Sequence, residues 1–244
     1  MEIEYAKICE KGLSREENQD AVFTCKTSEM AFFLVADGMG GHSHGEEASQ
    51  MLVMACAEWC KCFSERKYES DFSKMISTIR KMLMDTNQKV REEHKGSVCG
   101  AVFVLLFVYR KKYAVFSSGD ARVYFNQFWR YQKLTLDEVW ENQMERTKQE
   151  RENLQHPFRG RLVNAFGVKA ELKVRVLCDQ IAGRGVFLLC SDGLYKMCPE
   201  KYLKRQVQKA GWGVPIEKVI KQLRRTVYQN GAKDNLSIVL VKIL

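Results

Sequence analysis

The chain has 244 residues, of which 45% are hydrophobic and 28% charged, an ordinary composition for a soluble folded domain. Its formal net charge of +9 is compatible with a solvated basic surface or with an anionic partner. The longest apolar run, Ala101 to Tyr109, is too short to cross a bilayer, and the first residues lack the pattern of a signal peptide, so we expect neither a membrane segment nor a secreted protein.

The first half of the chain predicts three strands followed by two helices. We expect strands at about 3–9, 21–25 and 31–36, and helices from Glu46 to about Phe63 and from Phe72 to about His94. In the second helix apolar residues recur at helical spacing, which is typical of a face packed on a core.

The second half predicts mainly strands, then two helices and a final strand. Six strands are expected at about 98–109, 113–118, 121–125, 161–167, 171–177 and 185–191. The polar stretch "DEVWENQMERTKQERENLQ" interrupts them and is expected to be a mobile, partly helical insertion. Pro199 and Pro215 mark the first turns of the two helices, Asn230-Gly231 ends the second helix, and "LSIVLVKIL" closes the chain. Hairpin-like succession of strands favours an α+β fold with antiparallel sheets and helices packed outside.

Nine cysteines are present without a CxxC pair. Cys60 and Cys62 lie close together, but no second pair or histidine completes a zinc pattern with them. An odd count in a chain without a leader indicates reduced thiols and a cytoplasmic location. Four others stand in apolar segments and are expected in the core: Cys56, Cys99, Cys178 and Cys190.

Two Asp-Gly pairs follow apolar runs. Asp37 ends "FFLVAD" and Asp192 ends "VFLLCSD". A single Asp-Gly is most often a turn in which glycine takes positive φ. A carboxylate buried at the end of an apolar strand instead needs a compensating partner, because burial disfavours its charge.

Three more aspartates stand at strand ends: Asp20, Asp120 and Asp234. In antiparallel sheets the end of one strand lies beside the start of its neighbour, so all five carboxylates can meet at one edge. Bound Mg²⁺ or Mn²⁺ would compensate their charge, and two such ions can share one aspartate and a bridging water. Spacing alone leaves open whether they form such a cluster or are separate turn residues.

Six motifs, in a fixed order along the chain, resemble a known family and favour the carboxylate cluster over separate turn residues. They are "GLSREENQD", "VADGMGGHSHGEEAS", "SSGDARVY", "HPFRGRLVNAFG", "LLCSDGL" and "KDNLSIVLV". Together they resemble the metal-dependent protein phosphatases of the PP2C (PPM) family, the bacterial branch most closely. The resemblance implies an α-β-β-α sandwich of two antiparallel sheets flanked by helix pairs. It also implies one domain over residues 1–244, with a flap insertion at about 135–160.

The resemblance also implies a ligand set for two to three Mn²⁺ or Mg²⁺ ions. Asp37 would bridge two metals, and the carbonyl of Gly38 would help to hold one of them. Asp192 and Asp234 would complete one metal site, and Asp20 would support the other through water.

Two further roles follow from the same resemblance. Asp120, together with Asp192, would hold a third and weaker metal. Arg15 would bind the substrate phosphate, because a guanidinium matches phosphoryl oxygens bidentately. Asp37, Asp192, Asp234 and Arg15 are therefore the expected catalytic residues.

The implied activity is hydrolysis of phosphoserine and phosphothreonine in proteins by a metal-bridging water or hydroxide. The expected partners are phosphorylated proteins, among them a cognate Ser/Thr kinase, with no nucleic acid and no membrane, and the chain is expected to be a monomer. The alternative is a catalytically silent adaptor of the same fold, which would be expected to lack Asp37, Asp192 or Asp234.

The sequence departs from its relatives at several positions. Met39 stands where eukaryotic relatives carry a histidine proposed as general acid, and His42 and His44 downstream are expected to be structural or exposed. No general acid is therefore assigned.

Three further departures concern one ligand loop and the flap. Gln19 replaces a common glutamate, Glu138 a common histidine, and Gly160 a common asparagine. We expect a modest effect of Gln19 on metal affinity and an altered substrate preference from the flap.

Overall fold

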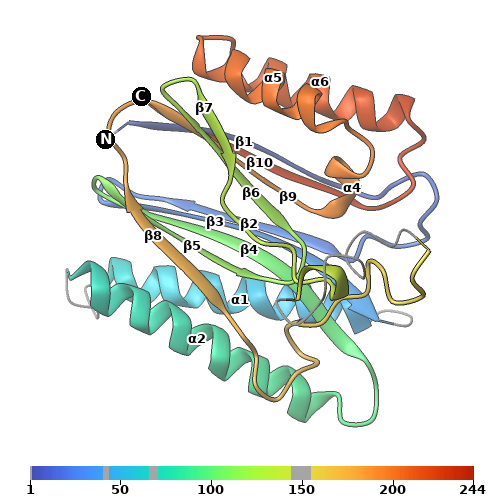
Figure 1. Cartoon of the computed structure of the whole chain (residues 1–244). Coiled ribbons are helices and arrows are strands. Elements are labelled where there is room, and N and C mark those ends of the chain that lie inside the picture. Colours follow the sequence, from blue (N-terminus) through green and yellow to red (C-terminus); the bar gives the residue numbers. More distant parts are fainter. Residues whose placement is uncertain (1, 41–43, 66–70, 144–154) are drawn as a thin grey trace.

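The computed structural model describes residues 2–40, 44–65, 71–143 and 155–244. Two five-stranded antiparallel sheets lie face to face, and a pair of helices covers the outer face of each (Figure 1). The molecule therefore has four layers in the order α-β-β-α, which confirms the expected fold class.

One sheet has the strand order β1-β10-β9-β6-β7. Its strands are β1 (Ile3–Glu10), β10 (Leu236–Ile243), β9 (Gly185–Cys190), β6 (Arg122–Gln127) and β7 (Arg130–Lys133). Helices α5 (Glu200–Gly211) and α6 (Ile216–Gln229) cover its outer face, and the short helix α4 (Asp192–Tyr195) follows β9 directly.

The other sheet has the order β2-β3-β4-β5-β8. Its strands are β2 (Asp20–Lys26), β3 (Met30–Gly40), β4 (Cys99–Tyr109), β5 (Lys112–Ser118) and β8 (Arg175–Gln180). Helices α1 (His44–Ser64) and α2 (Phe72–Glu93) pack on its outer face. The N-cap of α2 is Asp71, whose carboxylate accepts the amide hydrogen of Lys74 at 2.9 Å.

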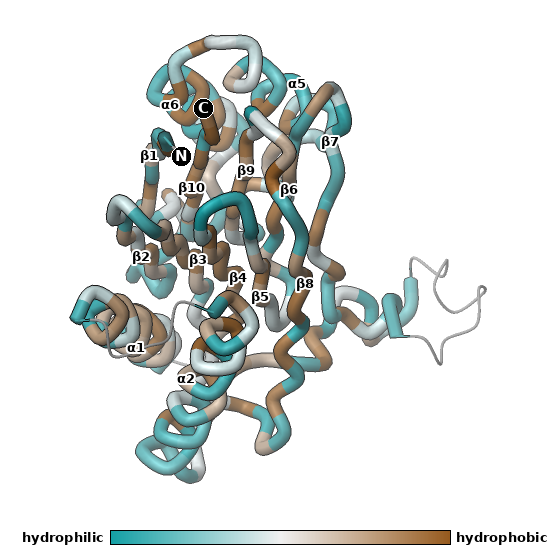
Figure 2. The backbone as a smooth tube through the Cα atoms, turned by 90° about the vertical axis from the view of Figure 1, so that its left-hand side faces the viewer, coloured by the Kyte–Doolittle hydropathy of each residue, from teal (hydrophilic) through white to brown (hydrophobic). Residues whose placement is uncertain are grey.

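Alternation along the central strands separates two apolar layers. In β3 the side chains of Phe32 and Leu34 pack against α1 and α2, while those of Phe33 and Val35 pack between the sheets. Both faces are buried, so the strand reads as an unbroken apolar run. Figure 2 shows these hydrophobic strands in the middle of the molecule and more polar segments outside them.

The same alternation explains the position of Asp37. It follows Val35 by two residues, so it lies on the face of β3 that is directed to the opposite sheet. The strand continues to Gly40, and Asp37 therefore lies within it and not beyond its end.

The segment before β9 differs from the prediction. Residues 161–167 form no strand but two isolated bridges, Val139 with Leu162 and Ala101 with Phe166. The strand expected at 171–177 is β8, which begins only at Arg175, because Leu172 and Val174 are buried in the layer under α1 and α2 ahead of the ladder.

Two smaller differences arise at sheet edges. Cys178 is exposed on the edge strand β8 and is not a core residue, whereas Cys56, Cys99 and Cys190 are buried as expected. The polar strand β7 was not predicted. It pairs with β6 through a two-residue turn at Phe128 and Trp129, whose φ angles are 48° and 72°.

The polar insertion contains one 3-10 turn, η1 (Trp140–Asn142), in its described part. Residues 144–154, where we expected further helix, lie outside the described residues. Among the described residues, no helix has the length and hydropathy of a membrane span.

Candidate active site

Strand register places two carboxylates directly opposite each other. Asp20, the first residue of β2, pairs with Asp37 of β3. Opposed residues of an antiparallel pair point to the same face, and like charges in such a pair are destabilising. The strand pairing thus creates a concentration of negative charge between the sheets.

The opposite sheet contributes two more carboxylates at the same place. Asp192 begins α4 immediately after β9, and Asp234 lies two residues before β10. Strands β9 and β10 are antiparallel neighbours, so the end of one lies beside the start of the other. Asp120 lies between β5 and β6, where the chain passes from one sheet to the other.

The five aspartates are close enough for the charges of the other four to act on Asp37. Burial first, and then the charges of Asp20, Asp192, Asp120 and Asp234, raise the pKa of Asp37 well above its usual value. Burial also raises the pKa of Asp20 to about 7, although hydrogen bonds with Ser237 and Ser191 oppose the shift. Burial is also the first cause of the raised pKa of Asp120, followed by the charge of Asp192.

This donor set fits hard divalent cations. Oδ2 of Asp20 is buried without a hydrogen-bond partner among the described residues. The ligand atoms on offer are carboxylate oxygens, which Mg²⁺ and Mn²⁺ prefer. A divalent cation would supply both the missing partner and the missing positive charge.

The two glycines that follow Asp37 and Asp192 are required by close backbone approach. A Cβ on Gly38 would lie 2.2 Å from the carbonyl oxygen of Gly45, and one on Gly193 would lie 1.9 Å from that of Asn235. Neither glycine has positive φ. The Asp-Gly pairs are therefore sites where neighbouring backbones touch, not turn signals.

Two cations stand at the rim of the cluster. Nη2 of Arg15 donates to Oδ2 of Asp234 at 2.7 Å, and the arginine side chain is half exposed. Nζ of Lys196 donates to Oδ2 of Asp192 at 2.5 Å. Lys196 was not predicted, although its position four residues after an aspartate that begins a helix favours such a pair.

A chain of contacts holds Asp120. The hydroxyl of Tyr195 donates to its Oδ2 at 2.9 Å, and the guanidinium of Arg122 lies 3.5 Å from the centre of the Tyr195 ring. Arg122 in turn donates to both oxygens of Asp137, at 3.1 and 2.7 Å. None of these three supporting residues was predicted, because their contacts depend on tertiary structure.

The family model of protein phosphatase 2C matches residues 14–241. The chain belongs to this family. It is 25% identical over 241 residues to the serine/threonine phosphatase stp of Listeria welshimeri, covering 96% of this chain and 93% of that protein.

Solved structures give the same result for the fold. The structure of PppA from Pseudomonas aeruginosa has a TM-score of 0.80 at 25% identity and covers 98% of this chain and 96% of its own. The catalytic domain of PstP, solved with two manganese ions, has a TM-score of 0.80 at 20% identity, with 99% of this chain and 98% of that one covered. The expected family and the enzyme class, a protein-serine/threonine phosphatase, are confirmed.

In this phosphatase, Glu138 belongs to a buried polar network. One oxygen accepts the amide hydrogen of Gly119 at 3.0 Å and Nδ2 of Asn164 at 2.6 Å. The other accepts Nε of Arg175 at 2.9 Å. Glu138 therefore fixes the position of Gly119, the residue before Asp120. Its buried negative charge is compatible with the fold because the guanidinium of Arg175 compensates it.

The remaining departures have local explanations. Gly160 has φ 75°, a conformation that asparagine also tolerates, and its amide donates to Oε2 of Glu141 at 2.9 Å. Gln19 contributes main-chain contacts: its carbonyl accepts the hydroxyl of Ser49 at 2.8 Å and its amide donates to Asn235 at 3.0 Å.

The positions at and after the missing general-acid histidine are Met39, His42 and His44. Met39 packs against the layer between the sheets. His42 lies outside the described residues. His44 lies beside Glu47 and His94 at the start of α1, a group that is treated below.

We expect Gly193→Ala to lower the free energy of unfolding by about 1–3 kcal/mol or more, because the new methyl group meets a backbone carbonyl that cannot rotate away. Urea unfolding monitored by circular dichroism measures the change. Gly211→Ala at the end of α5 is the control, since its Cβ would make ordinary contacts, 3.4 Å and longer. Equal stability of Gly193→Ala and wild type would contradict the close-approach explanation.

We expect Glu138→Gln to destabilise the fold by about 1–3 kcal/mol, because a neutral amide leaves a buried donor or the guanidinium unmatched. Arg175→Gln is the matched control and should cost less, since Glu138 keeps its bonds to Gly119 and Asn164. Urea unfolding of both variants tests this order, and a larger cost for Arg175→Gln would refute the assigned role of Glu138.

Proposed function

We propose that this chain hydrolyses phosphoserine and phosphothreonine in proteins and depends on two to three Mn²⁺ or Mg²⁺ ions. The observation that carries the proposal is the convergence of five aspartates from both sheets. Negative charge accumulates there, and the buried Oδ2 of Asp20 has no hydrogen-bond partner among the described residues. A structural neighbour, the PstP catalytic domain, is described as a complex with two manganese ions.

Each ligand has a defined place in this proposal. Asp37, on the inter-sheet face, would contact two ions, and Asp192 and Asp234 approach from the opposite sheet. The carbonyl of Gly38 would add one ligand, and Asp20 would orient water around the second ion. When bound, the ions supply a water of lowered pKa and positive charge for the phosphoryl oxygens.

A third ion would use Asp120 with Asp192. The bond from Tyr195 fixes the orientation of the Asp120 carboxylate, and the stacked guanidinium of Arg122 holds the tyrosine ring. This support leaves the other Asp120 oxygen for a ligand.

Arg15 would bind the phosphate of the substrate. Its side chain is half exposed beside Asp234, so a phosphoryl group entering from solvent can reach the guanidinium. The rigid fork of N–H donors orients phosphoryl oxygens, and the Asp234 carboxylate holds one arm of the fork.

The proposed enzyme is a single catalytic domain over residues 1–244, with the segment 135–160 as a flap. Phosphorylated proteins are its proposed substrates. The silent adaptor is not favoured, because Asp37, Asp192 and Asp234 are all present and clustered. Most basic residues of α5 and α6, such as Lys204 and Arg225, are exposed, as a solvated face requires.

Phosphate release from a phosphothreonine peptide should require Mn²⁺ or Mg²⁺ and stop with EDTA. Asp192→Asn, which keeps the side-chain volume, should lower kcat by about 10²–10³-fold, the order lost with one group that stabilises transition-state charge. Asp179→Asn on the exposed strand β8 is the control and should turn over normally. Full turnover in EDTA, or in Asp192→Asn, would refute the metal assignment.

Arg15→Lys keeps the positive charge but loses the planar array of guanidinium N–H donors. We expect KM for the phosphopeptide to rise about 10–100-fold, the equivalent of the 1.5–3 kcal/mol of a charged hydrogen bond. Arg224→Lys on α6 removes a comparable arginine–carboxylate pair, with Glu10, and is the matched control. Steady-state kinetics at fixed Mn²⁺ measure both, and an unchanged KM for Arg15→Lys would remove it from the phosphate site.

A further inference from the structure

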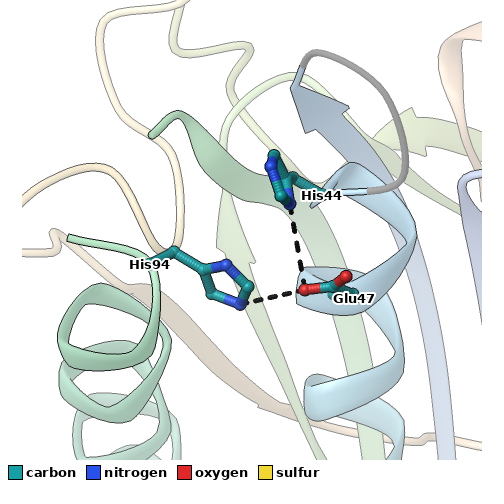
Figure 3. Close-up of side chains that lie close together, drawn as sticks. All are labelled: His44, Glu47 and His94. Carbon is teal, nitrogen blue, oxygen red and sulfur yellow. Dashed lines mark ion pairs between the residues drawn. The ribbon is translucent and has the colours of Figure 1, made fainter. Parts of the chain in front are cut away.

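A second group of metal-ligating side chains lies where α1 begins and α2 ends. His44 is the first residue of α1, Glu47 lies in its first turn, and His94 is the C-cap of α2 (Figure 3). Nε2 of His94 lies 3.1 Å from Oε2 of Glu47, and Nδ1 of His44 lies 3.9 Å from the same oxygen. The three ligand atoms all lie within 4.8 Å of one another.

The geometry is close to that of a bound ion. Metal–ligand distances of about 2.0–2.1 Å place neighbouring ligands of a tetrahedral zinc site roughly 3.3 Å apart. The contact of Glu47 with His94, at 3.1 Å, already has about this length, whereas His44, at 3.9 Å, would have to move closer. Nδ1 of His44 is buried and has no hydrogen-bond partner among the described residues, so it has an open requirement for a ligand.

We propose that His44, Glu47 and His94 form a zinc-binding site, with water as the fourth ligand. Two imidazoles and one carboxylate are a donor set that suits Zn²⁺, unlike the oxygen-only aspartate cluster. The site shares no residue with that cluster, so the zinc proposal does not rest on the proposed phosphatase reaction.

The local charges are compatible with a cation. The carbonyl end of α2 carries partial negative charge beside His94, whereas the amide end of α1 carries partial positive charge beside His44. These two contributions oppose each other. The carboxylate of Glu47 adds a full negative charge and decides the balance in favour of a cation.

The ion would tie the two outer helices to the edge of the sheet. Sγ of Cys99, the first residue of β4, donates to the carbonyl of His44 at 2.9 Å. Gly45, which follows His44 in the chain, packs its carbonyl against Gly38 of β3. Zinc would thus fix the position at which α1 leaves the sheet.

Binding is tested on the full-length chain carrying Asp37→Asn and Asp192→Asn, which disables the aspartate cluster, and on the wild-type chain in millimolar Mg²⁺. Competition with a chromophoric chelator gives the stoichiometry and affinity for zinc, and absorption of added Co²⁺ reports tetrahedral coordination. We expect one zinc per chain and a rise in Tm of roughly 5–10 °C at a hundredfold excess over Kd.

Single variants identify the ligands. His94→Gln and His44→Asn should each weaken zinc binding at least about 100-fold, since loss of a group that only supports a ligand costs about 10–100-fold. His156→Gln, which removes a histidine stacked on Trp140, is the matched control and should bind zinc normally. Metal-free melting curves check that each variant folds.

Two outcomes would overturn the proposal. One is the absence of zinc binding both in the double aspartate variant and in the wild-type chain with Mg²⁺. The other is zinc affinity that survives both histidine substitutions in folded protein. In either case the group is a helix-terminal ion pair between Glu47 and His94.

Discussion

Mutual repulsion among five carboxylates determines which other groups the candidate site needs. Strand pairing sets Asp20 against Asp37, and the second sheet adds more negative charge at the same edge. Neighbouring groups offset part of this charge, because Arg15 pairs with Asp234 and Lys196 pairs with Asp192. Among the described residues, the buried Oδ2 of Asp20 has no hydrogen-bond partner. A small multivalent cation would meet this requirement, so in the proposed enzyme a stable fold and metal binding would depend on each other.

Most of the architecture and the main site residues could be predicted from the sequence. Apolar runs favoured antiparallel sheets with helices outside, and strand ends in such sheets allowed Asp37, Asp192 and Asp234 to meet. The resemblance to the phosphatase family then implied the four layers and the cluster. The reason for the glycines was not predictable in the same way. A turn preference is a local property, whereas the contact of Gly193 with the backbone of Asn235 joins segments far apart in the chain.

The features that were missed share one cause: tertiary contacts replace local pattern at the edges of the structure. Alternation at 171–177 resembles a strand, yet Leu172 and Val174 are buried before the ladder begins. Cys178 lies in an apolar stretch but on an exposed edge. The contacts of Tyr195 with Asp120 and with Arg122 join separate elements of the structure. The contact of His94 with Glu47 of α1 does the same.

The two clusters differ in ligand chemistry, and this difference bears on metal choice. Zinc binds most N and O ligand sets more tightly than manganese or magnesium, so an oxygen-only cluster does not exclude it by affinity alone. The site at the helix ends would compete with the aspartate cluster for zinc, and its two imidazoles are ligands that zinc prefers. Gly45 on one side and Gly38 on the other are in backbone contact, so the two sites are joined by a single layer of main chain. An ion at the helix ends would therefore act on the position of β3, and through it on Asp37, without sharing a ligand with the aspartates.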